Sequence, residues 1–165
     1  MKKITLLIIS LLLLIYVNAC TGYKPIYGTS NFKFKIVDHS IKGNKQLGNQ
    51  IYSKLHRLFK PDKNKPNVKS VHITIETSKD TNATIKNSAG KILEYKVTIN
   101  TNIILKDFLT NHEILNYNVS ASSSYKVQDK YSETIKLENK TINDLINKIY
   151  QDLLIKMSET ILTKW

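Results

Sequence analysis

The chain has 165 residues, a sequence pI of about 9.6 and a formal net charge of +12 at pH 7. This length suits one domain with a sizeable core, and a single cysteine excludes an internal disulfide. The basic charge favours an anionic partner. Arg57 is the only arginine, and neither a zinc pattern nor an RNP-like aromatic motif occurs, so composition argues against nucleic acid and favours phosphate-bearing lipid or a membrane surface.

The first 19 residues are organised like a secretory leader. Lys2 and Lys3 precede a mostly aliphatic run of 14 residues, 4–17, and the small Ala19 lies just before Cys20. The run is too short to cross a hydrocarbon core of about 30 Å, which takes about 20 helical residues. The segment resembles a bacterial lipobox, which implies cleavage before Cys20 and acylation of its thiol and new amine. An ordinary secretory signal with a chance cysteine is the alternative.

After the leader, the sequence predicts a tether, a strand and a helix. Residues 20–31 form a short extended tether punctuated by glycine and proline. Residues 32–37 alternate between apolar and polar side chains, which is typical of a strand. A helix follows, ended by the proline at position 61, and residues 61–67 form a surface loop rich in lysine and asparagine. The helix is indicated by apolar residues that lie on one face: Leu47, Ile51, Leu55, Leu58 and Phe59.

The remaining sequence predicts strands and a final helix. Residues 71–76 alternate as a half-buried strand, whereas residues 78–90 are polar and interrupted, although Ala83 and Ile85 could extend a strand or form its bulge. Residues 94–127 alternate on both sides of a turn at 110–112, which predicts a long antiparallel hairpin. Helical spacing then runs from Ile142 to Ile161, and Thr141 or Asn139 is the expected helix cap.

The order strand, helix, strand, strand, strand, helix predicts an α+β fold. A strand-helix-strand crossover favours parallel neighbours. We therefore expect a two-layer sandwich in which a mixed four-stranded sheet carries both helices on one face. The expected organisation is a cleaved signal peptide at residues 1–19, a lipidated tether at 20–31 and a single domain at 32–165.

No motif indicates catalysis. His39, His56, His72 and His112 lie on different predicted elements and form no HExxH pattern. No serine lies in a Gly-x-Ser-x-Gly elbow, no phosphate-binding loop occurs, and the one cysteine is assigned to lipid. The carboxylates of Glu133, Glu138 and Asp144 are expected to face solvent. The sequence therefore predicts a protein that is not an enzyme, with no cofactor and no metal site.

The polar face of the predicted hairpin is the remaining candidate site. Its lysines are Lys96, Lys106 and Lys126, and the serine run 122–124 lies nearby. Lysine ammonium groups attract phosphates as point charges without fixed geometry. These three lysines are our candidates for binding the phosphates of a lipid, and a solvated sheet face is the alternative.

Three segments resemble the LPS-assembly lipoprotein family LptE, in its short alphaproteobacterial form. Residues 19–28 are similar to that family's lipidated start, which continues with an aromatic, a proline and Leu/Ile-Tyr-Gly. Residues 123–132 are similar to its Ala-Ser-Tyr-Asn segment, which leads to a second aromatic. The acidic-to-apolar C-terminal helix follows, as it does in the family. The order of elements matches over nearly the whole mature chain.

The resemblance implies an outer-membrane lipoprotein that faces the periplasm and is anchored through Cys20. It implies partnership with the LptD β-barrel, help in assembling that barrel, and transport of lipopolysaccharide to the cell surface. Thr21 after Cys20 is compatible with release to the outer membrane. Lysine and asparagine replace residues usually seen in the family, so among site residues only Cys20 is carried across by motif.

Two alternatives remain open. An auxiliary lipoprotein of an ABC-type envelope lipid transporter would share this lipidated architecture and would copurify with an inner-membrane permease instead of a barrel. An envelope hydrolase with a dispersed site would bring a histidine, a carboxylate and a nucleophile together in a pocket.

Overall fold

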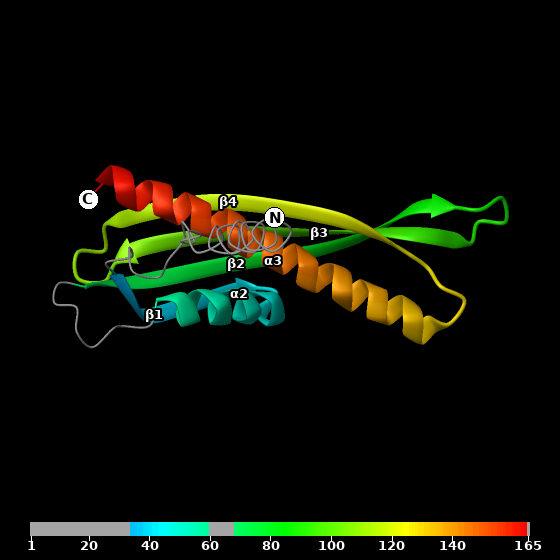
Figure 1. The fold of residues 1–165 in the computed structure, drawn as a ribbon, viewed down its shortest axis with the longest axis horizontal. Coiled ribbons are helices and arrows are strands. Elements are labelled where there is room, and N and C mark those ends of the chain that lie inside the picture. Colours follow the sequence, from blue (N-terminus) through cyan, green and yellow to red (C-terminus); the bar gives the residue numbers. More distant parts are fainter. Residues whose placement is uncertain (1–33, 60–67, 165) are drawn as a thin grey trace, which may run out of the picture.

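The computed structural model describes residues 34–59 and 68–164 and forms a four-stranded sheet with two helices over one face (Figure 1). The strands lie in the order β1-β2-β3-β4, with β1 parallel to β2 and the other two pairs antiparallel. The elements in chain order are β1 (Phe34–Gly43), α2 (Lys45–Leu58), β2 (Lys69–Lys86), β3 (Ile92–Asp107), β4 (Glu113–Lys126) and α3 (Tyr131–Lys164). The predicted fold class is confirmed. The expected signal peptide and the whole of the expected tether lie outside the described residues.

The core lies between the sheet and the helices. Alternate residues of β2, β3 and β4 point toward the helix layer, where α2 covers β1 and β2 and α3 covers β4 and β3. Each fully buried isoleucine or leucine contributes about 1.5–3 kcal/mol. The buried set includes Ile51, Leu55, Ile73, Ile75, Val97, Ile99, Ile103, Ile149 and Leu153.

The step from β1 into α2 is fixed by backbone geometry at Gly43 and Asn44. Gly43 has a φ of +70°, and a Cβ there would collide with the carbonyl oxygen of Thr77. The Asn44 N–H donates to that same oxygen at 2.8 Å, and the Asn44 side chain accepts from the Leu47 N–H at 3.1 Å as the helix cap. These contacts hold the start of α2 against β2.

Three boundaries differ from the sequence prediction. β1 runs on to Gly43, because its last residues pair with β2. β2 continues to Lys86, since β3 supplies backbone partners for a segment with no hydrophobic period; register shifts around Ile85 confirm the bulge. α3 begins at Tyr131, before the expected Asn139 or Thr141 cap, because buried Thr134 binds the Gln128 N–H at 2.9 Å and anchors the first turn.

The β2–β3 hairpin projects past the helix layer. Every residue from Ser78 to Lys91 is exposed, and Figure 1 shows this arm extending beyond both helices. At the base of this arm, Lys79 forms an ion pair with Glu138 of α3, with Nζ and Oε1 3.1 Å apart. Glu138 was expected to be a solvent-facing charge, so this contact was missed.

In the described residues, no helix has the length and apolar character that a bilayer span requires.

Candidate functional site

The sheet face away from the helices is mostly polar, and we call it the open face. Strand alternation places its side chains opposite the buried ones. It carries amides, hydroxyls and a few charges where a second layer of a sandwich would require apolar residues. The open face comprises Asp38, Ser40 and Lys42 of β1; His72, Thr74, Glu76 and Ser78 of β2; Glu94, Lys96, Thr98, Asn100, Asn102, Ile104 and Lys106 of β3; and Asn116, Asn118, Ser120, Ser122, Ser124 and Lys126 of β4.

A network of amide hydrogen bonds crosses the centre of the open face. Asn102 on β3 donates to the side-chain oxygens of Asn118 at 2.7 Å and Asn116 at 3.1 Å, both on β4. Ser120 donates to the Asn100 side-chain oxygen at 2.7 Å. These bonds reduce the rotamer freedom of the polar side chains while leaving further donors and acceptors directed outward. An open depression lies here, lined in part by Ser78, Asn100, Asn102, Asn118 and Ser120.

The three candidate lysines share the open face but not one cluster. Lys96 and Lys106 are ten residues apart on β3, a span of about 33 Å at 3.3 Å per residue. Lys126 on β4 pairs with Glu94 and is therefore a diagonal neighbour of Lys96. Lys106 lies at the other end, opposite His72 on β2. The structure thus brings Lys96 and Lys126 together and leaves Lys106 apart. Cys20 lies outside the described residues.

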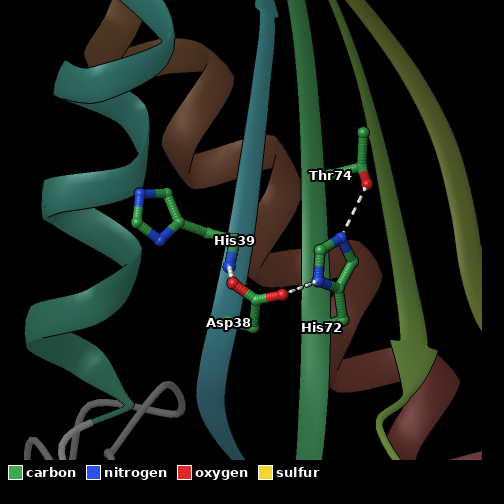
Figure 2. A network of polar contacts seen from close by, with 4 residues as sticks. All are labelled: Asp38, His39, His72 and Thr74. Atoms are coloured by element: carbon green, nitrogen blue, oxygen red, sulfur yellow. Dashed lines mark hydrogen bonds and ion pairs between the residues drawn. The ribbon is translucent and has the colours of Figure 1, made fainter.

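His72 joins two strands on the open face near its β1 edge (Figure 2). Its Nδ1 lies 2.9 Å from Asp38 Oδ2, and its Nε2 lies 3.2 Å from the Thr74 hydroxyl. The other Asp38 oxygen accepts from the His39 N–H at 2.8 Å. The hydrogen bond from His72, followed by the one from His39, lowers the pKa of Asp38 below its ordinary value of 3.8. The sequence did not reveal this contact, because it depends on the parallel register of β1 with β2 and on the irregularity between Ile36 and Asp38.

The other histidines lie elsewhere. His39 stacks on Tyr52 of α2 with ring centroids 4.0 Å apart, and His56 lies 5.5 Å from the same ring. His112 is exposed in the β3–β4 turn. Within residues 34–59 and 68–164, no group of three or more His, Cys, Asp or Glu side chains could hold a metal ion.

Comparison with known proteins gives a match in structure but not in sequence. No family model matches the chain, and no curated protein matches it significantly. The rare lipoprotein B from Shewanella oneidensis superposes with a TM-score of 0.56 at 10% identity, covering 76% of this chain and 97% of that one. This chain shares the fold of that lipoprotein. At such identity the likeness extends to the fold alone.

Two further structures give the same result. Lipoprotein B from Nitrosomonas europaea matches with a TM-score of 0.54 at 15% identity, covering 81% of this chain and 88% of that one. The minor lipoprotein from Acinetobacter baumannii matches with a TM-score of 0.51 at 15% identity, covering 75% of this chain and 93% of that one. In all three cases, the shared region spans most of the neighbour's chain.

Proposed function

We propose that this protein is an outer-membrane lipoprotein that partners an LptD-like β-barrel, assists its assembly, and helps to transport lipopolysaccharide. The observation that carries the proposal is the open face, a broad polar sheet surface on a fold shared with bacterial lipoproteins. The lipobox ending at Cys20 and the segments that resemble LptE support the same proposal.

The chemistry of the open face suits the inner wall of a barrel. Large outer-membrane barrels have polar interiors, so a protein inside one must present hydrogen-bonding groups instead of an apolar patch. The side chains of Asn100, Asn102 and Asn118 are already held by the amide network. A surface that is ordered in advance loses less side-chain entropy on binding.

The lysines supply the proposed contact with lipopolysaccharide. Lys96 and Lys126 lie near one end of the open face and can attract two phosphates of one headgroup as point charges. Lys106 is too far away to join them on the same phosphate and would serve a second contact. Because both groups of charges flank the amide network, barrel contact and lipid contact can use separate parts of this face.

Copurification from the native host tests the partnership. Tagged mature protein, extracted from envelopes in mild detergent, should bring down one large β-barrel of the LptD class, identified by mass spectrometry. Asn118→Trp should reduce recovery of the barrel at least several-fold, because the bulky ring disrupts the amide network and keeps the barrel wall from contacting the open face. Asn147→Trp is the matched control, since Asn147 is an exposed asparagine on α3. Recovery of an inner-membrane permease would favour the ABC-type transporter alternative instead.

Depletion tests the transport role separately. Loss of the protein should leave lipopolysaccharide accumulating in the inner membrane and LptD misassembled. Normal amounts of lipopolysaccharide at the cell surface after full depletion would contradict the proposed role.

One observation favours the hydrolase alternative. Thr74, His72 and Asp38 lie in the order hydroxyl, imidazole, carboxylate that nucleophilic hydrolases use. The Asp38 side chain is 57% exposed, however, whereas the carboxylate of such a triad is buried. We therefore infer that the contact ties β1 to β2. Hydrolysis of a p-nitrophenyl ester that is abolished by His72→Ala but retained by His112→Ala would overturn this inference.

A further inference from the structure

The β3–β4 turn, residues 107–112, presents two adjacent apolar side chains to solvent. Leu109 is 87% exposed and Phe108 is 52% exposed. Of the large apolar side chains in the described parts of the chain, Leu109 is the most exposed. Single exposed apolar residues are common on protein surfaces, but two neighbours at the tip of a turn form a localised apolar projection.

Hydrogen bonds fix this turn. The Asp107 carboxylate accepts from the N–H groups of Leu109 at 3.0 Å and Thr110 at 2.9 Å, and these bonds lower its pKa below the ordinary value. The Asp107 backbone also bonds His112 and Asn111 at 2.9 and 3.0 Å, and Asn111 adopts a φ of 57°. The apolar tip is therefore held outward by an ordered backbone.

The turn lies at the end of the sheet where β1 begins. The Phe108 N–H donates to the Ser70 carbonyl at 2.9 Å, and the preceding residue, Lys69, pairs with Phe34, the first residue of β1. Figure 1 shows the start of β1 and the β3–β4 turn at the same end of the molecule. Cys20 precedes Phe34 by 14 positions, and that length of chain spans at most about 50 Å. A lipid on Cys20 thus sets an upper limit of about 50 Å on the distance between this end of the sheet and the membrane.

Two lysines lie around the tip, together with the carboxylates of Asp107 and Glu113. Lys69 is exposed beside the turn, and its ammonium group adds to the lowering of the Asp107 pKa. Lys106 lies on the strand that leads into the turn, and Glu113 begins the strand that leaves it. Apolar side chains that enter the headgroup region, with lysines level with the phosphates, are the usual arrangement at a membrane interface.

We propose that the β3–β4 turn is a second, protein-made membrane contact, in which Leu109 and Phe108 enter the leaflet that carries the lipid on Cys20. The proposal rests on the lipidation of Cys20 that the proposed function includes, but not on the barrel partner. The lipid makes insertion of the tip intramolecular, so two side chains suffice to orient the domain. The strands then lead away from the membrane, and the β2–β3 turn at Gly90 stands about 50 Å from Asp107 along β3.

A fluorescent probe at the tip tests the contact. Lipidated Cys20 has no free thiol and is the only cysteine, so Leu109→Cys provides one labelling site in the mature protein. The exposure of Leu109 makes this change compatible with folding. After labelling with an environment-sensitive nitrobenzoxadiazole dye, the protein is placed in phosphatidylethanolamine and phosphatidylglycerol vesicles whose acyl chains carry a spin-label quencher. We expect a blue shift and at least twofold quenching at position 109.

Ala89→Cys is the matched control, because Ala89 is exposed in the β2–β3 turn at the opposite end of the sheet. Its dye should keep the emission seen in water and resist the quencher. Equal quenching at both positions, or none at position 109 in protein shown by intact mass to be acylated, would overturn the proposal. Energy transfer between dyes at position 109 of separate molecules, without lipid quenching, would show that a second copy covers the tip and would also overturn it. Vesicles contain no barrel, so these outcomes are independent of the copurification result.

Discussion

Thr77 on β2 and Thr101 on β3 lie directly opposite each other, and both are buried, at 2% and 3% exposure. The Thr77 hydroxyl donates to the Asn44 carbonyl at 2.8 Å, whereas the buried Thr101 hydroxyl has no hydrogen-bond partner among the described residues. Burying a hydroxyl without a partner costs about 1–3 kcal/mol. We expect Thr101→Val to raise the free energy of unfolding by about 1 kcal/mol, measured by urea denaturation.

Thr77→Val is the control for that change, because it has the same shape but removes the bond to Asn44. It should lower the free energy of unfolding by about 1–2 kcal/mol. If both valine variants were destabilised equally, the two hydroxyls would be in equivalent environments, contrary to the structure.

Tyr125 makes folding sensitive to alkaline pH. Burial, together with the nearby Glu138 carboxylate, raises the pKa of Tyr125 from 10.0 to about 12. Its contribution to stability is therefore complete below pH 10 and is lost as the pH rises toward 12, because the unfolded chain ionises first. The loss is on the order of 2 kcal/mol.

Tyr125→Phe should flatten the fall in stability between pH 10 and 12, as followed by circular dichroism during denaturation. Tyr117→Phe provides the comparison, since Tyr117 lies on the same strand, β4, eight residues before Tyr125. An alkaline slope that survives Tyr125→Phe unchanged would contradict this account of the buried hydroxyl.

Asp38 gives the opposite dependence at acid pH. Because the pKa of Asp38 is lowered in the folded state, its contribution to stability is present above pH 3.8. That contribution is lost as the pH falls through the lower pKa of the folded state. We expect the Asp38 carboxyl carbon, followed by NMR, to titrate below 3.8 in the wild-type protein. In His72→Ala the midpoint should move up toward 3.8, because the strongest hydrogen bond is gone. An unchanged midpoint would mean that His72 does not bind Asp38 in solution.

The elements with a hydrophobic period could be predicted from the sequence. Residues 94–127 alternate cleanly and form β3 and β4, and the apolar stripe from Leu47 to Phe59 marks α2. The end of β2 could not be found in the same way, because residues 78–86 are exposed on both faces and depend on β3 for their conformation. The start of α3 could not be predicted from the sequence for a related reason, since its first turns are mostly polar and are anchored by a hydrogen bond to the Thr134 side chain.

The candidate site was predictable as a surface but not as an arrangement. Alternation placed Lys96, Lys106 and Lys126 on one polar face, yet their grouping depends on strand register, which a single sequence does not give. The amide network of Asn102 likewise requires β3 and β4 to be aligned. The Asx turn at Asp107 had a local signal, an aspartate followed by threonine and asparagine, that could have drawn attention to the tip.

Crosslinking from the open face tests the central claim most directly. A photoreactive benzoylphenylalanine in place of Asn118 should crosslink in living cells to a large outer-membrane β-barrel of the LptD class. The same group in place of Asn147, an exposed asparagine on the outer side of α3, should give at most a small fraction of that product. Strong barrel crosslinks at Asn147 with none at Asn118, or crosslinks from Asn118 to an inner-membrane permease alone, would contradict the account.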